Sequence, residues 1–300
     1  MDARTDRATS RLSLARGRSA SVVRGLPPLW LAALAVALFI PNLVAAWTTV
    51  QTIVADGYAY DWTNFVAASQ RLGDGTLYDA AGQYAFRWSP IAAAAFVVIA
   101  PIGLTAWRLS HIAVLLFLRD WRLIALVLLS YPFWFDVETG NVNTFIAVAA
   151  VNALRGSRVG TGIFLASFVL VPRPVVFPLV IWLVWKRPGW RWPLVAGSGW
   201  HAAVAGLTGL SSGWIFALVG ASSEMQGPLN LAPSGVIGAW WVPIGLVLAA
   251  WFTIRGRLGL ASVAASPYWL PYYLLMLILE FVRPPELDQR RTQMAAVESS

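Results

Sequence analysis

Long apolar runs, separated by short polar segments, make up most of the chain from residue 29 to residue 282. Several of these runs approach the roughly 20 residues that an α-helix needs to cross the hydrocarbon core of a bilayer. Because a spanning helix satisfies its own backbone hydrogen bonds, repeated runs of this length favour helices over a barrel. The pattern predicts an all-α integral membrane protein, a polytopic bundle of roughly 8–10 transmembrane helices that form one domain over residues 29–282.

The composition agrees with a membrane protein, and the charge indicates its orientation. Hydrophobic residues make up 58% of the chain and charged residues only 12%, against about 25% charged residues in soluble domains. The net charge of +8 comes largely from arginines in short clusters between the apolar runs and in both tails. Since cytoplasmic segments of membrane proteins carry such an excess, we expect the tails 1–28 and 283–300 to be cytoplasmic and the first of them to be disordered. The same pattern argues for contact with anionic lipid and against a nucleic-acid partner.

A polar segment follows the first apolar run and forms a predicted outer loop over residues 48–87. It carries four carboxylates in a chain where charge is scarce: Asp56, Asp61, Asp74 and Asp79. Apolar residues at helical spacing from Trp62 to Leu72 predict a short amphipathic helix that lies in the membrane interface. Asp61 stands just before this helix, in the N-cap position.

Asp61 has two competing interpretations. As a general base at the lipid–water boundary, it would take a proton from an acceptor hydroxyl, and desolvation would raise its pKa toward a useful value. As an N-cap, it would accept a hydrogen bond from the backbone N–H of Asn64 and would be a weaker base. Asp56 is the second acid, which could assist Asp61, share a divalent ion with it or simply be solvated. Asp74 and Asp79 lie among glycines and are expected to be turn residues.

Two arginines stand apart from the cytoplasmic clusters. Arg87 lies where the chain enters the membrane from the outer side, and it either holds a phosphate or extends its charged end to the interface. Arg173 is flanked by prolines in the segment VPRP, in the middle of an apolar run, which indicates a broken helix that faces the protein interior. An arginine at this depth needs an anion, and the two candidates are a phosphate and an internal ion pair with Glu138.

A second polar segment, ETGNVN, precedes another apolar run and is expected on the same outer face. Glu138, Asn141 and Asn143 could bind substrate through their polar groups, the amides by contacting sugar hydroxyls, and Gly140 allows a tight turn between them. Capping of the following helix by Asn141 is an equal alternative. His111 stands alone on a predicted helix and is expected to be satisfied by packing.

The residue inventory argues against several kinds of chemistry. With no cysteine and only two histidines, the chain lacks the residues for a thiolate site or a histidine-rich metal site. The glycine motifs with which nucleotide-binding proteins hold phosphates are also missing from the sequence. We therefore expect neither a metal nor a cofactor.

Several short motifs, taken in order, resemble a known family. They are Asp61 with Trp62, Gly75 to Tyr78, Phe86 to Pro90, Gly140 to Asn143, Arg173 with Pro174, and Ser266 to Tyr268. Each motif is short, and it is their order over residues 29–282 that resembles the C-type membrane glycosyltransferases, which use polyprenyl-phosphate sugars. Within that class the chain is most similar to the bacterial polyprenol-phosphate-mannose-dependent α-mannosyltransferases.

The resemblance implies an inverting transfer of a sugar, with mannose as the expected sugar, from a polyprenyl-phosphate donor to a lipid or glycan acceptor at the outer face of a bacterial plasma membrane. It implies that Asp61 is the base, that Arg87 and Arg173 contact the phosphate, and that Tyr78 belongs to the substrate site. Two other functions stay open. One is a transporter or lipid flippase with its site at two broken helices, at VPRP (residues 171–174) and at SPYWLP (residues 266–271). The other is a glycosyltransferase-like subunit without catalytic activity.

Overall fold

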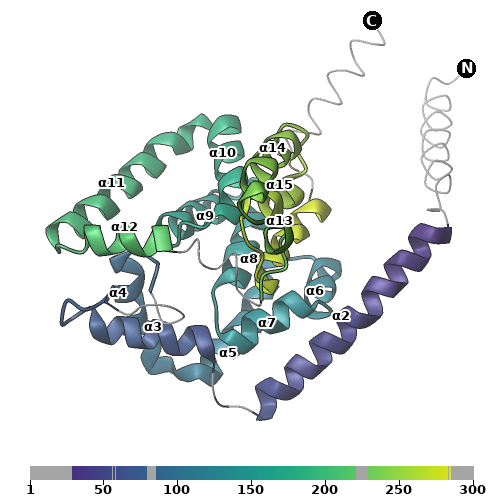
Figure 1. Ribbon diagram of the computed structural model, residues 1–300, viewed down its shortest axis with the longest axis horizontal. Coiled ribbons are helices and arrows are strands. Elements are labelled where there is room, and N and C mark those ends of the chain that lie inside the picture. Colours follow the sequence, from purple (N-terminus) through teal and green to yellow (C-terminus); the bar gives the residue numbers. More distant parts are fainter. Residues whose placement is uncertain are drawn as a thin grey trace, which may run out of the picture. The chain divides into compact units, whose positions relative to one another are not determined.

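The structure is a computed structural model of the chain (Figure 1). It describes residues 29–55, 57, 59–79, 86–220, 229–282 and 284. The predicted tails, 1–28 and 283–300, lie outside the described residues except for residue 284, and so does the candidate acid Asp56.

The chain divides into two compact units, Met1–Val44 and Ala45–Ser300. The described part of the first unit belongs to helix α2 (Leu29–Ala55), which contains Pro41 and continues into the second unit. All elements after α2, and every residue of the site considered below, belong to the second unit. The single domain over residues 29–282 stays a prediction.

Every regular element in the described ranges is a helix, so the all-α prediction is confirmed for this part of the chain. After α2 the α-helices are α3 (Tyr60–Arg71), α4 (Pro90–Ile99), α5 (Gly103–Val114), α6 (Trp121–Leu128), α7 (Tyr131–Thr139), α8 (Asn143–Leu154), α9 (Arg158–Leu170), α10 (Phe177–Lys186), α11 (Arg191–Leu207), α12 (Ser211–Gly220), α13 (Ser234–Ile237), α14 (Trp241–Ile254) and α15 (Leu258–Ala265). The 3-10 helices are η2 (Ala100–Ile102), η3 (Leu115–Leu118), η4 (Pro174–Val176), η5 (Pro188–Trp190), η7 (Gly238–Trp240) and η8 (Pro271–Phe281).

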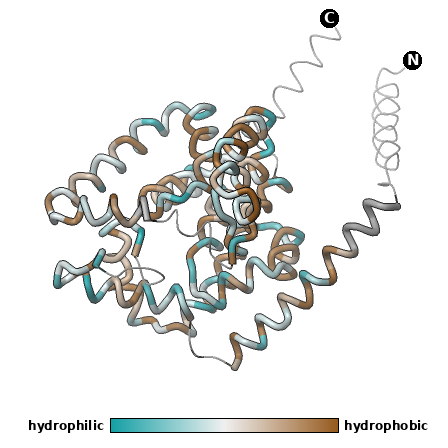
Figure 2. The backbone as a smooth tube through the Cα atoms, in the orientation of Figure 1, coloured by the Kyte–Doolittle hydropathy of each residue, from teal (hydrophilic) through white to brown (hydrophobic). Residues whose placement is uncertain are grey.

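Three helical stretches in the described ranges are long and apolar enough to cross a membrane: Ala37–Ala55, Pro90–Leu118 and Ser234–Ile254. Figure 2 shows that hydrophobic residues also occur along most of the other helices. Further apolar helices, such as α8 and α9, have only 10–17 residues, fewer than the roughly 20 that a straight span needs. The structure thus supports a membrane protein, and the number of 8–10 crossings stays a prediction.

The stretch Pro90–Leu118 is interrupted at Pro101 and not at Arg108. α4 gives way to a 3-10 turn that contains Pro101, as expected for a residue without a backbone N–H. Arg108, by contrast, lies inside the continuous helix α5. Its guanidinium donates to the carbonyl of Glu138 at 3.2 Å and to that of Val137 at 3.3 Å. The end of α7 therefore accommodates this arginine without a break in α5.

α8 forms the centre of the larger hydrophobic core of the second unit. Nearly every residue from Asn143 to Leu154 is buried, as is typical of a helix that is apolar on all sides. α8 packs against α9 on one side and against η8 on another. Phe133 of α7 and Trp182 of α10 are buried in the same core. The ETGNVN segment thus leads directly into a buried core helix.

A second, aromatic core joins α3 to α4. Trp62 and Phe65 of α3 are buried together with Trp88, Phe96 and Trp107. Ring centroids lie 4.6 Å apart for Phe65 and Phe96 and 5.5 Å apart for Trp62 and Trp107, distances at which aromatic pairs attract each other. The predicted amphipathic helix is therefore confirmed as α3, and its apolar face packs against α4. Its place in the membrane interface stays a prediction.

α4 begins where the local sequence chemistry favours a helix start. Ser89 is the N-cap, and its Oγ accepts the N–H of Ala92 at 3.3 Å. Pro90 occupies the first turn, where its missing N–H costs no hydrogen bond. The N–H of Ser89 donates to the carbonyl of Leu170 at 3.1 Å. This bond joins the start of α4 to the end of α9.

Both predicted helix breaks are present. α9 and η4 are separated by residues 171–173, and α15 and η8 by residues 266–270. A proline begins the helix after each break, and its missing N–H prevents a continuous helix. The two breaks interact, because Arg173 in the first interacts electrostatically with Tyr268 in the second. The guanidinium carbon of Arg173 also lies 5.4 Å from the ring centre of Tyr273 in η8.

Gly140 sets how closely α3 approaches the turn between α7 and α8. Its φ of +71° lies in the left-handed region, which glycine adopts without a steric penalty. A Cβ at this position would lie 2.8 Å from the Cβ of Trp62. The indole N–H of Trp107 donates to the Gly140 carbonyl at 2.8 Å. The predicted tight turn is confirmed, and it brings α3 within reach of the polar segment that follows.

We predict that Gly140→Ala destabilises the protein more than Gly75→Ala. Gly75 also has a positive φ, +79°, but open space surrounds its Cβ position, so Gly75→Ala should cost only the left-handed penalty of roughly 1–2 kcal/mol. Gly140→Ala adds a clash with the α3 helix that should cost a further ~1–3 kcal/mol. Apparent melting temperatures in one lipid or detergent measure both costs, and equal values for the two variants would contradict the close approach.

Candidate functional site

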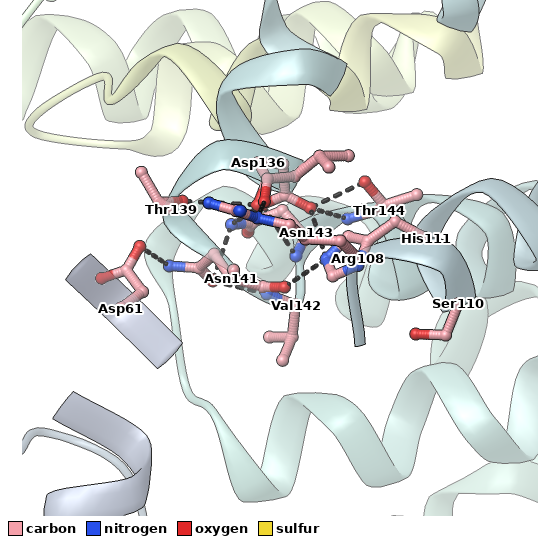
Figure 3. Close-up of polar contacts among 12 residues, drawn as sticks. Asp61, Arg108, Ser110, His111, Asp136, Thr139, Asn141, Val142, Asn143 and Thr144 are labelled. Carbon is pink, nitrogen blue, oxygen red and sulfur yellow. Dashed lines mark hydrogen bonds and ion pairs between the residues drawn. The ribbon is translucent and has the colours of Figure 1, made fainter. Parts of the chain in front are cut away.

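Asp61 lies in the first turn of α3 and is not its N-cap. The N-cap is Ala59, and no side-chain hydrogen bond caps this helix. The interpretation of Asp61 as a cap for the N–H of Asn64 is therefore wrong. The Asp61 Oδ2 instead accepts a hydrogen bond of 2.6 Å from Nδ2 of Asn141, which lies on the turn between α7 and α8 (Figure 3). The carboxylate is thus directed toward another part of the chain.

The side-chain amide of Asn141 has a fixed orientation. Its Oδ1 accepts hydrogen bonds from the N–H of Val142 at 2.7 Å, from Nδ2 of Asn143 at 3.0 Å and from Nη2 of Arg173 at 3.1 Å. Because the oxygen faces three donors, the amide nitrogen faces the carboxylate of Asp61. Donors on the oxygen also polarise the amide and strengthen the bond that its N–H makes. Capping of α8 by Asn141 is not observed, since the N-cap is Val142.

Arg173 is buried beside this amide, with 7% of its surface exposed. Its Nη1 donates to Oδ1 of Asn143 at 2.6 Å. Its hydrogen bonds to described residues thus go to neutral amide oxygens and not to the carboxylate of Glu138, so the expected ion pair is not the arrangement found. The guanidinium carbon lies 5.0 Å from the ring centre of Trp88 and 5.4 Å from that of Tyr273. At these distances cation–π attraction also stabilises the guanidinium.

Asp136 organises the start of α8, although the sequence analysis did not single it out. It is completely buried. Its Oδ1 accepts the N–H and Nδ2 of Asn143 at 3.3 and 3.2 Å, and its Oδ2 accepts the N–H and Oγ1 of Thr144 at 2.8 and 2.7 Å. A carboxylate here satisfies N–H groups that have no partner inside the helix, and it interacts favourably with the helix dipole. The cap comes from the preceding helix, so local spacing gave no signal for it.

His111 lies under the same turn and is completely buried, as expected. Its Nδ1 is 2.9 Å from the carbonyl oxygen of Trp107, and its Nε2 is 2.6 Å from the carbonyl oxygen of Asn141. Nε2 is also 3.7 Å from Oδ2 of Asp136. The ring packs against Phe145 with centroids 4.7 Å apart. His111 therefore supports the backbone of the residue that contacts Asp61.

The carboxylates of the first loop differ in their electrostatics. Burial raises the pKa of Asp61 from its ordinary value of 3.8 to about 6. The hydrogen bond from Asn141 and the charge of Arg173 act in the opposite direction, because both favour the ionised form. Asp74 is exposed, and hydrogen bonds from Thr76 lower its pKa. The pKa of Asp61 is thus raised toward neutrality, where a general base is most effective, whereas that of Asp74 is lowered.

Of the remaining predicted site residues, Glu138, Arg87 and Tyr78 belong to the described ranges. Glu138 is half-buried in the last turn of α7. Arg87 precedes Trp88 and interacts electrostatically with Tyr268, which lies in the second helix break. The hydroxyl of Tyr78 donates to the carbonyl of Trp88 at 2.7 Å and so fixes the segment that enters α4.

The two predicted turn carboxylates lie away from the network. Oδ1 of Asp74 accepts the N–H of Thr76 at 3.0 Å, which is a turn contact as expected. Asp79 is exposed, and its N–H donates to the carbonyl of Thr76 at 3.1 Å. Neither residue reaches the site.

Four of the predicted site residues thus form one hydrogen-bonded chain: Asp61, Asn141, Asn143 and Arg173. Within the described ranges, no group of three or more His, Asp or Glu side chains is placed to hold a metal ion. The arrangement offers a carboxylate that can accept a proton near neutral pH and a buried cation that can attract an anion. No family model, no curated protein and no solved structure matches this chain. A function must therefore follow from the chemistry of the site itself.

We predict that Asp136→Asn destabilises the protein far more than Asp120→Asn. Asp120 also receives a helix-start N–H, that of Arg122 at 3.0 Å, but its side chain is 38% exposed. Since asparagine caps about as well as aspartate, Asp120→Asn should change stability by less than about 0.5 kcal/mol. Asp136→Asn turns an NH2 group toward buried donors and should cost about 2–4 kcal/mol. Similar losses of apparent melting temperature for both variants would contradict the capping role of Asp136.

Proposed function

We propose that this chain is a membrane glycosyltransferase that moves a sugar, mannose in the first instance, from a polyprenyl-phosphate donor to a lipid or glycan acceptor. One observation supports the proposal above the others: the amide of Asn141 joins a carboxylate, Asp61, to a buried cation, Arg173. Transfer from a sugar phosphate needs a base for the acceptor hydroxyl and positive charge for the departing phosphate. The two groups are held in one network here.

The proposed reaction assigns one role to each group. Asp61 takes the proton of the acceptor hydroxyl while the acceptor oxygen attacks the anomeric carbon on the face opposite to the phosphate. The new carbon–oxygen bond forms as the bond from the anomeric carbon to the phosphate oxygen breaks, and that electron pair leaves with the phosphate. The configuration at the anomeric carbon is thereby inverted. Arg173 stabilises the negative charge that develops on the leaving phosphate, with Arg87 as a second candidate contact.

The electrostatics of Asp61 suit this role. With a pKa of about 6, Asp61 is ionised in most molecules at neutral pH and can accept a proton. An exposed carboxylate with an ordinary pKa near 3.9 would be ionised as well, but it would be a weaker base. The polyprenyl phosphate is itself a good leaving group, so no nucleotide is needed to activate the sugar.

We further propose that the chain crosses a bacterial plasma membrane several times, with this site at the outer face. α3 follows directly after the candidate span Ala37–Ala55. The basic residues before that span are expected to remain in the cytoplasm, which directs Asp61 to the opposite side. There the site would lie at the lipid–water boundary, where a polyprenyl phosphate presents its head group.

A transporter or lipid flippase is the second candidate, and the interaction of the two helix breaks through Arg173 favours it. Interrupted helices that surround a charged group are typical of the substrate sites of secondary transporters. A transporter moves its substrate without chemical change and needs no general base. The two functions therefore differ in what the loss of Asp61 should do.

Sugar transfer by the purified protein in lipid nanodiscs tests the proposal, with radiolabelled polyprenyl-phosphate mannose as donor and a cell-envelope lipid extract as acceptor. We expect Asp61→Asn to lower the rate by about 10²–10⁴-fold, the usual contribution of a general base. Asp74→Asn, the same substitution at an exposed carboxylate of the same loop, should leave the rate unchanged. The wild-type rate should fall below about pH 6, because Asp61 then becomes protonated.

Two results would contradict this assignment. A rate that survives in a folded Asp61→Asn variant would move the base elsewhere, and Asp56 would be the next candidate. If folded wild-type protein transferred neither mannose nor other polyprenyl-linked sugars, the enzyme proposal would be wrong. Uptake of labelled lipid phosphate into vesicles would then test the transporter.

A further inference from the structure

The amide of Asn141 connects two groups of opposite charge without letting them form an ion pair. Its nitrogen donates to Asp61 at 2.6 Å, and its oxygen accepts from Arg173 at 3.1 Å. Arg173 is buried and Asp61 is partly buried, and charges in such surroundings are less screened than in water. A change of charge at one end of this bridge therefore alters the free energy of the other end.

We propose that anion binding at Arg173 and proton binding at Asp61 are coupled, so that each increases the affinity for the other. The proposal rests on the assignment of Arg173 as an anion site in the proposed function, and it adds a rule for how that site is regulated. The ligand class is a phosphate ester. The phosphate of a lipid head group and that of a small soluble ester would bind the same guanidinium. The site would thus respond to the protonation of a carboxylate on a different helix.

A bound anion has two effects on Asp61, and both increase the affinity of its carboxylate for a proton. First, the anion adds negative charge near Asp61 and neutralises the arginine charge that favours ionised Asp61, so the carboxylate binds a proton more tightly. Second, the anion competes with Oδ1 of Asn141 for the N–H groups of Arg173. The amide is then less polarised and donates a weaker hydrogen bond to Asp61. By thermodynamic linkage, a proton on Asp61 must strengthen anion binding by the same factor.

This coupling would give the proposed reaction a direction. Arrival of the donor phosphate makes Asp61 a stronger base at the moment when the acceptor hydroxyl must lose its proton. After transfer, Asp61 carries that proton, and the product is a phosphate monoester, which holds more negative charge than the donor diester. The protonated carboxylate retains this product, and loss of the proton to water then favours its release.

Other titratable and charged groups face the same network and must be separated from Asp61 in any test. Asp136 lies on α7, His111 on α5 and Tyr272 on η8, and each contacts or interacts electrostatically with a member of the network. Tyr273 and Tyr268 interact electrostatically with Arg173, and Tyr268 also with Arg87. The test therefore assigns any pH effect with a variant of Asp61 itself.

The test measures the affinity of folded full-length protein in nanodiscs for two singly charged phosphodiesters by calorimetry. Dimethyl phosphate is the soluble probe, and polyprenyl-phosphate mannose is the lipid probe. Neither probe changes its charge between pH 5 and pH 7.5 to any important extent, so a pH effect must come from the protein. We expect wild-type protein to bind at least about fivefold more tightly at pH 5 than at pH 7.5, the lower end of typical coupling.

Matched variants assign the effect to its residues. Asp61→Asn should bind at pH 7.5 as tightly as wild type does at pH 5 and should lose the pH dependence. Asp74→Asn should keep the wild-type behaviour. Arg173→Gln should lose binding at both pH values, and Arg173→Lys, which keeps the charge, should bind more weakly but retain the pH dependence. Binding of the lipid probe alone would support coupling at a lipid-linked ligand, whereas binding of both would show that the phosphodiester group suffices.

Three outcomes would overturn the proposal. They are equal wild-type affinities at both pH values, a pH dependence that persists in Asp61→Asn, and binding that Arg173→Gln leaves unchanged. Persistence in Asp61→Asn would assign the proton to another group such as His111. Because the experiment requires no sugar transfer, coupled binding by a protein that transfers nothing would contradict the proposed function and leave the coupling intact.

Discussion

The hydrogen bonds that Asp136 accepts from the start of α8 are the contacts on which the site depends. α8 is almost entirely buried, so its first N–H groups cannot rely on water. Asp136 supplies the missing acceptors from the end of α7 and at the same time binds the amide nitrogen of Asn143. The oxygen of Asn143 in turn holds Arg173. The position of the buried cation thus follows from the way in which a core helix is capped.

The second constraint is the neutral bridge between the two candidate reactive groups. A direct ion pair between Asp61 and Arg173 would lower the pKa of the carboxylate and leave little positive charge for a ligand. The Asn141 amide connects the two groups by hydrogen bonds, so that Asp61 can still act as a base and Arg173 can still attract an anion. Gly140 makes this geometry attainable, since any side chain at its position would meet Trp62 and push α3 away. A base, a cation and their connection therefore depend on one glycine turn.

Local patterns in the sequence predicted much of the fold and part of the site. Apolar periodicity located α3, prolines located both helix breaks, and the glycine in ETGNVN located the turn. The N-cap of α3 was misplaced because apolar spacing leaves a helix end uncertain by one or two residues. Asp136 was missed because it caps a helix other than its own, which is a tertiary contact. One of the two expected partners of Arg173 was the carboxylate of Glu138, and only the fold shows that amide oxygens take its place.

The number of membrane crossings was the least predictable feature. The hydrophobic pattern counts apolar residues, whereas a crossing needs an uninterrupted helix of sufficient length. Turns and prolines divide the apolar runs into short helices such as α8 and α9. Sequence pattern alone cannot tell whether such pieces span a membrane in pairs or lie within the protein.

Direct titration of the Asp61 carboxyl group tests the central claim most directly, namely that this side chain is a partly buried base that accepts a hydrogen bond from Asn141. Infrared difference spectra of wild type and Asp61→Asn, recorded across the pH range in nanodiscs, isolate the protonated carboxyl signal of this one residue. A midpoint near pH 6 is expected. A midpoint near the ordinary value of 3.8 would show a solvated carboxylate and would contradict the site described here.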